Sequence, residues 1–180
     1  IGLVHQDRVV LQVINENLDQ GTPPMRGRHN FRRILDFLEK LQPTGSSDLT
    51  QSLRSFCLKH RSKGVVVLLS DLMDKNGVDH AFRTLVAQNM DVYVIQILSQ
   101  EEIDPDLNGD FKMVDVEDAD ETEITASGAL IDQYKQTLNA FRAHIQQFCS
   151  QRGISYLFTS NQISFEKLVL TWFRKRGLLR

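Results

Sequence analysis

The 180-residue sequence predicts a doubly wound α/β fold, in which a mostly parallel sheet is flanked by helices. Two observations support this class. Short runs of apolar, β-branched residues alternate with longer segments of helical periodicity, a pattern that implies βαβ crossovers. Two of the runs, 65–69 (VVVLL) and 92–98 (VYVIQIL), are apolar at almost every position, which is typical of parallel strands covered on both faces. The length suits one domain, so residues 1–180 are assigned to a single domain.

Four segments are predicted to be the main strands of the sheet. Residues 8–14 (RVVLQVI) form a compact β-branched run, and residues 65–70 and 92–98 contain the two continuous apolar runs. Residues 154–158 (ISYLF) give a shorter run directly after Gly153. We expect the last three strands to be mutually parallel.

Helices are predicted wherever apolar residues recur every three or four positions. Each of these stripes is interpreted as a face that packs on the core. The stripes lie at residues 31–41, 49–57, 78–86, 134–148 and 165–173.

An acidic insertion interrupts the alternation before the long fourth helix. Between Glu101 and Glu123 there are 11 acidic residues and one basic residue, although the net charge of the whole chain is only −2. Residues 111–116 and 123–125 within this stretch predict a short hairpin. The stretch is either a solvated surface loop or a patch that attracts a partner or a cation.

The composition disfavours several classes of protein. The longest apolar run, 65–69, is far shorter than the roughly 20 residues of a membrane-spanning helix, and no signal-peptide pattern opens the chain. We therefore expect a cytoplasmic protein with no membrane segment in this chain. Cys57 and Cys149 lie in predicted helices without a Cys-x-x-Cys motif, which favours two buried thiols over a disulfide. The basic residues lack the interleaved aromatic side chains of a nucleic-acid platform, so nucleic acid is not an expected partner.

Two loops are predicted to lie at the carboxyl edge of the sheet, where α/β folds bind ligands. The loop 45–49 (GSSDL) runs into a helix, and either Ser47 or Asp48 would cap it. The loop after the strand 65–70 carries Ser70 and Asp71. A hydroxyl and a carboxylate on neighbouring loops suit Mg²⁺, whereas helix capping and turn formation are the structural alternative.

The order and spacing of four segments resemble a known family. They are 5–9 (HQDRV), 23–28 (PPMRGR), 45–49 (GSSDL) and 68–71 (LLSD). Together they resemble the von Willebrand factor A-like domain of the family called domain of unknown function 58. The resemblance implies association with a MoxR-type AAA+ ATPase and no established catalytic activity.

The resemblance also implies a metal-ion-dependent adhesion site, in which Ser47 takes the position of a threonine ligand and Asp71 that of the third-loop aspartate. Ser46, Asp48 and Asp74 flank these two residues and are expected to contact the partner. The first loop of such a site, Asp-x-Ser-x-Ser, has no counterpart here. We therefore expect an N-terminally incomplete domain that lacks its first strand. Mg²⁺ is then implied for the intact protein and is not expected to bind these 180 residues alone.

A first strand would be central in the doubly wound order, so its loss predicts an internal gap beside the strand 65–70. An exposed strand edge invites pairing with another chain. We expect either a second chain in the gap or poor solubility. The competing arrangement is a direct ladder between residues 8–14 and 65–70.

The function predicted from these features is that of a non-catalytic protein-binding module. The sequence contains no Gly-x-x-x-x-Gly-Lys-Ser/Thr, no Gly-x-Gly-x-x-Gly and no Gly-x-Ser-x-Gly motif. No histidine is placed by sequence to activate Ser70. Two alternatives remain open: a structural scaffold without a metal site, and a small hydrolase on a Rossmann-like sheet.

Overall fold

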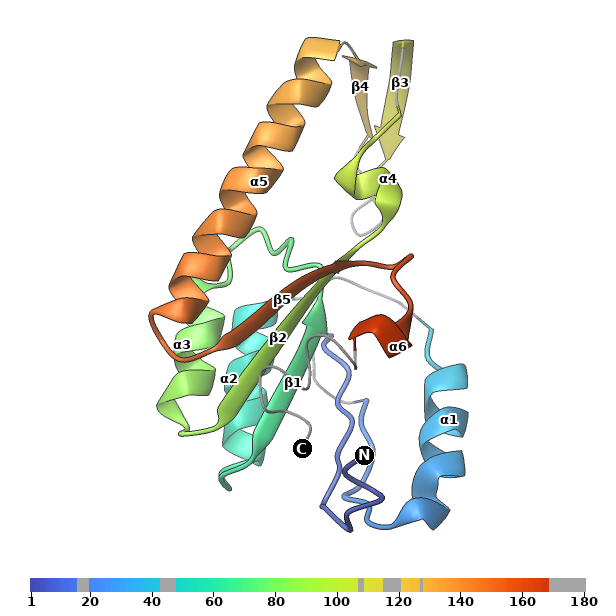
Figure 1. Cartoon of the computed structure of the whole chain (residues 1–180), viewed down its shortest axis with the longest axis vertical. Coiled ribbons are helices and arrows are strands. Elements are labelled where there is room, and N and C mark those ends of the chain that lie inside the picture. The colour runs from blue at the N-terminus through green and yellow to red at the C-terminus, as the bar shows by residue number, and fades with distance from the viewer. Residues whose placement is uncertain (16–19, 43–47, 107–108, 115–120, 127, 169–180) are drawn as a thin grey trace.

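The computed structural model describes residues 1–15, 20–42, 48–106, 109–114, 121–126 and 128–168. Helices and strands alternate along these ranges, as the sequence predicts (Figure 1). The elements are the 3-10 helix Arg28–Asn30, α1 (Phe31–Glu39), α2 (Leu49–Lys59), β1 (Val65–Ser70), α3 (Asp79–Ala87), β2 (Asp91–Leu98), α4 (Gln100–Ile103), β3 (Gly109–Val114), β4 (Glu121–Ala126), α5 (Gly128–Ser150), β5 (Ser155–Ser160) and α6 (Phe165–Leu168).

The central sheet has three strands in the order β1-β2-β5, and both pairings are parallel. Val65 pairs with Asp91 and Ser70 with Gln96, so β1 and β2 end at the same edge. The three predicted parallel strands and the α/β class are thereby confirmed. The acidic hairpin is confirmed as well, since β3 and β4 pair antiparallel at some distance from the sheet (Figure 1).

The core lies between one face of this sheet and three helices, α2, α3 and α5. Each helix contributes the apolar stripe that its periodicity predicts. The central side chains are almost completely buried, because parallel strands and their crossover helices pack face to face. They include Leu53 and Cys57 of α2, Phe82 and Leu85 of α3, Val94 of β2, and Ile145 and Cys149 of α5.

The prediction that residues 8–14 belong to the sheet is wrong. This segment pairs antiparallel with residues 20–25: Val9 and Met25 exchange two backbone hydrogen bonds of 2.8 and 2.9 Å, and Thr22 N donates to Leu11 O at 2.9 Å. No backbone hydrogen bond joins 8–14 to β1 in the described residues. A β-branched run favours an extended conformation but does not specify which strand it pairs with.

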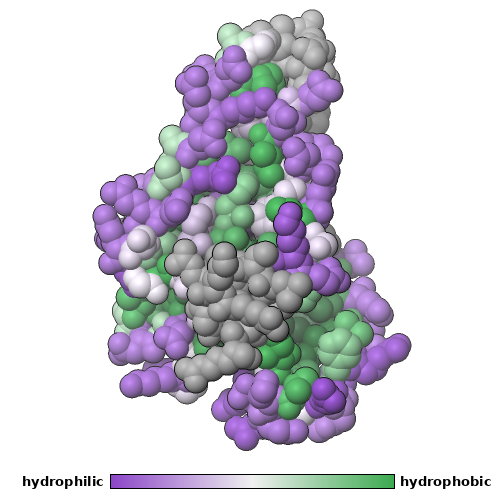
Figure 2. Space-filling view, in the orientation of Figure 1, coloured by the Kyte–Doolittle hydropathy of each residue, from purple (hydrophilic) through white to green (hydrophobic). Residues whose placement is uncertain are grey.

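Strand β1 is covered on one face, whereas the sequence predicts burial on both. Leu68 points into the core and is 5% exposed, but Val65, Val67 and Leu69 are 56%, 45% and 59% exposed. These three residues alternate along the strand and therefore share the opposite face. Hydrophobic surface is visible beside α1 in Figure 2. The edge of β1 that faces away from β2 has no paired strand among the described residues.

The remaining elements agree with the periodicity. Helices α1, α2, α3 and α5 fall on four predicted stripes, and α6 covers the start of the fifth, whose residues 169–173 lie outside the described residues. Cys57 and Cys149 are both free and buried, as predicted. None of the helices in the described ranges combines the length and hydropathy needed to cross a bilayer.

Candidate functional site

A tight turn at the carboxyl end of β1 carries the candidate site. Within the turn, Ser70 Oγ accepts the Leu72 N–H at 3.0 Å, and Asp71 Oδ1 accepts the Met73 N–H at 2.9 Å. Such side-chain-to-backbone bonds stabilise a turn locally, because they satisfy the backbone N–H groups of Leu72 and Met73 without a neighbouring strand. The Asp71 side chain is exposed, and no hydrogen bond to its second carboxylate oxygen is seen among the described residues.

Leu72 holds this turn in a strained conformation. Its φ is 64°, in the left-handed region that a leucine adopts at a cost of about 1–2 kcal/mol. The side chain is only 1% exposed and packs in the main core cluster. Burial of a leucine contributes about 1.5–3 kcal/mol, enough to offset that cost. The core thus fixes the direction in which Asp71 leaves the sheet.

A buried polar network fixes the same turn from below. Gln96, in the middle of β2, is fully buried, and its Nε2 donates to Asp71 O at 2.7 Å. Its Oε1 accepts the Tyr156 hydroxyl of β5 at 2.6 Å. Burial raises the pKa of Tyr156 to about 12, against an opposing effect of nearby Arg142, so the hydroxyl remains a donor at neutral pH. All three strands of the sheet therefore contribute to holding Asp71.

Asp74 joins the two loops that the sequence places at this edge. Its Oδ2 accepts the Leu49 N–H at 2.7 Å, at the first residue of α2, and its Oδ1 accepts the Asn76 N–H at 2.7 Å. Asp48 is the N-cap of the same helix, because its side chain accepts the Gln51 N–H at 2.8 Å. The prediction that these loops are neighbours is thus met through Asp74 and Leu49.

The other two candidate residues, Ser46 and Ser47, lie outside the described residues. The predicted proximity of Ser47 to Asp71 therefore stays a prediction. Of the three aspartates that the structure does describe, Asp74 accepts backbone N–H groups with both carboxylate oxygens, and Asp48 does so with Oδ1. Only Asp71 has an exposed carboxylate with an oxygen not engaged in the turn.

The described residues do not fit a Mg²⁺ site by themselves. A hexacoordinate Mg²⁺ is usually held by one or two carboxylates together with water or substrate oxygens. No group of three or more His, Cys, Asp or Glu side chains able to hold a metal comes together in the described part of the chain. Asp74 uses both carboxylate oxygens, and Asp48 and Asp71 use one each, to accept backbone N–H groups, so no chemistry is assigned to a metal here and Mg²⁺ binding stays a prediction for the intact protein.

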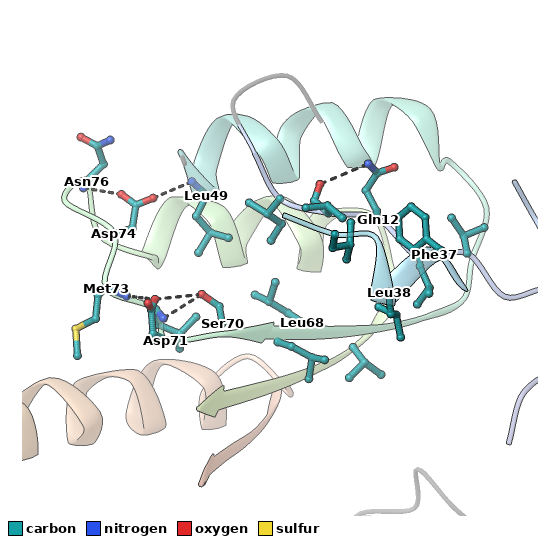
Figure 3. A pocket seen from close by; sticks show the side chains of 18 of the residues that line it. Gln12, Phe37, Leu38, Leu49, Leu68, Ser70, Asp71, Met73, Asp74 and Asn76 are labelled. Carbon is teal, nitrogen blue, oxygen red and sulfur yellow. Dashed lines mark hydrogen bonds between the residues drawn. The ribbon is translucent and has the colours of Figure 1, made fainter. Parts of the chain in front are cut away.

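A large cavity begins at this turn and runs along β1. It has a volume of about 630 Å³ and separates β1 from residues 10–14. Asp71, Met73 and Asp74 lie at one end, and Phe37 and Leu38 of α1 lie at the other (Figure 3). A smaller cavity of about 130 Å³ continues between the same two segments, from Val65 to Leu68. The direct ladder between 8–14 and 65–70 is therefore not formed. The predicted internal gap between strands is not found either, because β1 is the edge strand of the described sheet and the cavity separates it from residues that do not belong to the sheet.

Sequence reasoning missed the parts of the site that depend on distant contacts. Gln96 could have been noticed, because it is the one polar side chain inside the apolar run 92–98, and a buried polar group needs a partner. Leu72 and Tyr156 carry no comparable signal, since neither a left-handed leucine nor a hydrogen-bonded tyrosine stands out from its neighbours in the sequence.

Comparison with known protein families identifies the family to which the chain belongs. Residues 3–144 match the family described as protein of unknown function DUF58. The chain belongs to this family. The part matched to DUF58 contains the whole strand-end turn, the start of α2 and Gln96, whereas Tyr156 lies beyond it. No curated protein and no solved structure matches the chain.

Proposed function

We propose that this DUF58 chain is a non-catalytic protein-binding module that engages its partner at the carboxyl edge of the sheet. The observation that carries the proposal is the exposed carboxylate of Asp71, on a turn fixed by Leu72 and Gln96 at one end of the cavity of about 630 Å³. A fixed charge at the rim of an apolar cavity favours recognition, because little side-chain entropy is lost when a partner binds.

The partner we propose is a MoxR-type AAA+ ATPase, which the resemblance to the von Willebrand factor A-like domain of the DUF58 family implies. That resemblance also implies a cation between the domain and its partner. Because no group of metal-holding side chains comes together in the described residues and Asp71 is the most exposed of the three aspartates, we propose instead that its carboxylate meets a cationic donor of the ATPase directly, as in a charge-assisted hydrogen bond.

The chemistry at Ser70 supports binding rather than hydrolysis. Its hydroxyl accepts the Leu72 N–H and lies 3.5 Å from Asp71 Oδ1. No histidine of the described residues hydrogen-bonds to it, so the histidine base of a serine hydrolase is lacking there. We therefore propose that the protein shows no turnover.

The test separates the charge of Asp71 from its role in the turn. Asp71→Asn keeps an oxygen that can accept the Met73 N–H but removes the charge, whereas Asp71→Ala removes both. Asp91→Asn is the matched control, because Asp91 is an exposed aspartate at the opposite end of the sheet. Each variant is titrated against the cognate ATPase by calorimetry, with and without chelator, and its thermal melting is recorded.

We expect Asp71→Asn to weaken binding about tenfold or more without a change in melting temperature, since a hydrogen bond to a charged group contributes about 1.5–3 kcal/mol. Asp91→Asn should bind normally, and chelator should have no effect. Full binding by Asp71→Asn would refute the proposal and favour a structural scaffold. Binding that chelator abolishes would refute direct recognition by the carboxylate.

A further inference from the structure

A second cleft lies between α3 and α5, formed by residues that the proposed site does not use. Its volume is about 250 Å³. The polar side chains around it are mostly cationic or hydrogen-bond donors. They are Arg83 of α3, His144, Gln147 and Gln151 along and just after α5, and Arg152, together with one acid, Asp79.

Two guanidinium groups converge on this cleft over one aromatic ring. The guanidinium carbon of Arg152 lies 3.6 Å from the Phe148 ring centroid, and that of Arg83 lies 5.8 Å from the same centroid. The two carbons can therefore be no further apart than the sum of these distances. Phe148 is 6% exposed and belongs to the core, so it provides a rigid floor. Arg152 is also oriented by its NH1, which donates to Phe148 O at 3.2 Å.

The single acid of the cleft is already engaged elsewhere. Asp79 Oδ1 lies 3.1 Å from His144 Nε2, which places its charge at the histidine. Neither Arg83 nor Arg152 forms an ion pair within the described residues. The two guanidinium groups repel each other, and an anion bound between them would attract both and so offset this repulsion.

We propose that this cleft binds a phosphate group, with the guanidinium groups of Arg83 and Arg152 as its main ligands. Guanidinium donors match tetrahedral oxyanions in both charge and geometry. The side-chain amides of Gln147 and Gln151 line the same cleft and add neutral donors. The chemistry is shared by inorganic phosphate and by a phosphomonoester on a larger molecule. This site does not depend on the function proposed for Asp71.

The test uses the full chain, labelled with ¹⁵N, and follows the arginine side-chain resonances while inorganic phosphate is added at constant ionic strength. Phosphoserine is titrated in a parallel experiment, which distinguishes the free anion from a monoester. Arg83→Gln is the main variant, because Arg83 is exposed and its loss leaves the core intact. Arg142→Gln is the matched control, since Arg142 lies on α5, one of the two helices that border the cleft, but stacks on Phe158, outside the cleft.

We expect saturable shifts of the Arg83 and Arg152 resonances, and about a tenfold weaker affinity in Arg83→Gln. Arg142→Gln should bind as the wild type does. Arg152→Gln also removes a bond to the helix end, so its binding is interpreted only alongside its melting curve. The proposal is overturned if neither phosphate nor phosphoserine gives saturable shifts, or if Arg83→Gln and Arg142→Gln bind equally well.

Discussion

Replacing Gln96 with leucine tests whether the buried network holds the candidate site. Leucine is apolar and comparable to glutamine in volume, although it branches one carbon earlier, so the change removes two hydrogen bonds while keeping the interior of β2 filled. It leaves Asp71 O without its 2.7 Å donor and the Tyr156 hydroxyl without its 2.6 Å acceptor. Each polar group left unpaired on burial costs about 1–3 kcal/mol. Tyr156 is only half-buried and can reach water, so we expect a total loss of about 2–4 kcal/mol.

The loss is measured by urea unfolding of the wild type, Gln96→Leu, Tyr156→Phe and the double variant. For a domain of this size it corresponds to a fall of roughly 4–16 °C in melting temperature. Tyr156→Phe removes one bond, so the double variant should be less destabilised than the sum of the two single variants, by about 1 kcal/mol. A loss below about 0.5 kcal/mol for Gln96→Leu, or strictly additive effects, would refute the network's role.

Three further outcomes follow from burial and exposure. Cys57 and Cys149 are free and buried, and burial raises the pKa of the Cys149 thiol to about 12. A thiol–disulfide exchange reagent should therefore label neither cysteine at pH 8 until the chain unfolds. Labelling of the native protein would contradict this. The pKa of Tyr156 is raised from 10.0 to about 12, so the unfolded chain loses this proton first. Its contribution to the free energy of unfolding should be complete below pH 10 and lost as the pH rises towards 12, a decline that urea titrations should find smaller in Tyr156→Phe. Val67 and Leu69 are 45% and 59% exposed on an edge strand, which invites pairing with another copy of the chain. Val67→Lys and Leu69→Lys should therefore reduce self-association in sedimentation experiments. Unchanged association would exclude this face as the contact between copies.

Local pattern was sufficient to predict most of the fold. The apolar runs at 65–70 and 92–98 predict β1 and β2 almost to the residue, because a continuous run rich in β-branched residues favours a strand even where, as in β1, only one face is covered. The segment 8–14 has the same local signature yet pairs with 20–25. Strand pairing depends on the turn chemistry and on the distant strand, neither of which is encoded in a seven-residue run.

The candidate site was predictable only in part for the same reason. Asp71 was placed correctly, since the end of a buried strand fixes the edge of the sheet at which its next residue lies. The contact of Asp74 with the start of α2 joins loops that lie 25 residues apart, and Gln96 reaches Asp71 across the same interval. Sequence spacing does not report such contacts, because they arise only once β1 and β2 are aligned.

The strain at Leu72 shows how this edge of the sheet is kept rigid. A glycine there would adopt a φ of 64° without steric cost and so relieve about 1–2 kcal/mol. It would also forfeit the burial of the leucine side chain, which is worth about 1.5–3 kcal/mol, and it would widen the conformational freedom of the turn. The two contributions to the free energy of unfolding nearly cancel, but the leucine and glycine forms would differ in the conformational freedom of the turn. With leucine, any movement of the turn must withdraw an apolar side chain from the core, whereas glycine would let Asp71 swing. The strained residue therefore contributes little net stability and much directional control over the one exposed carboxylate at the mouth of the cavity.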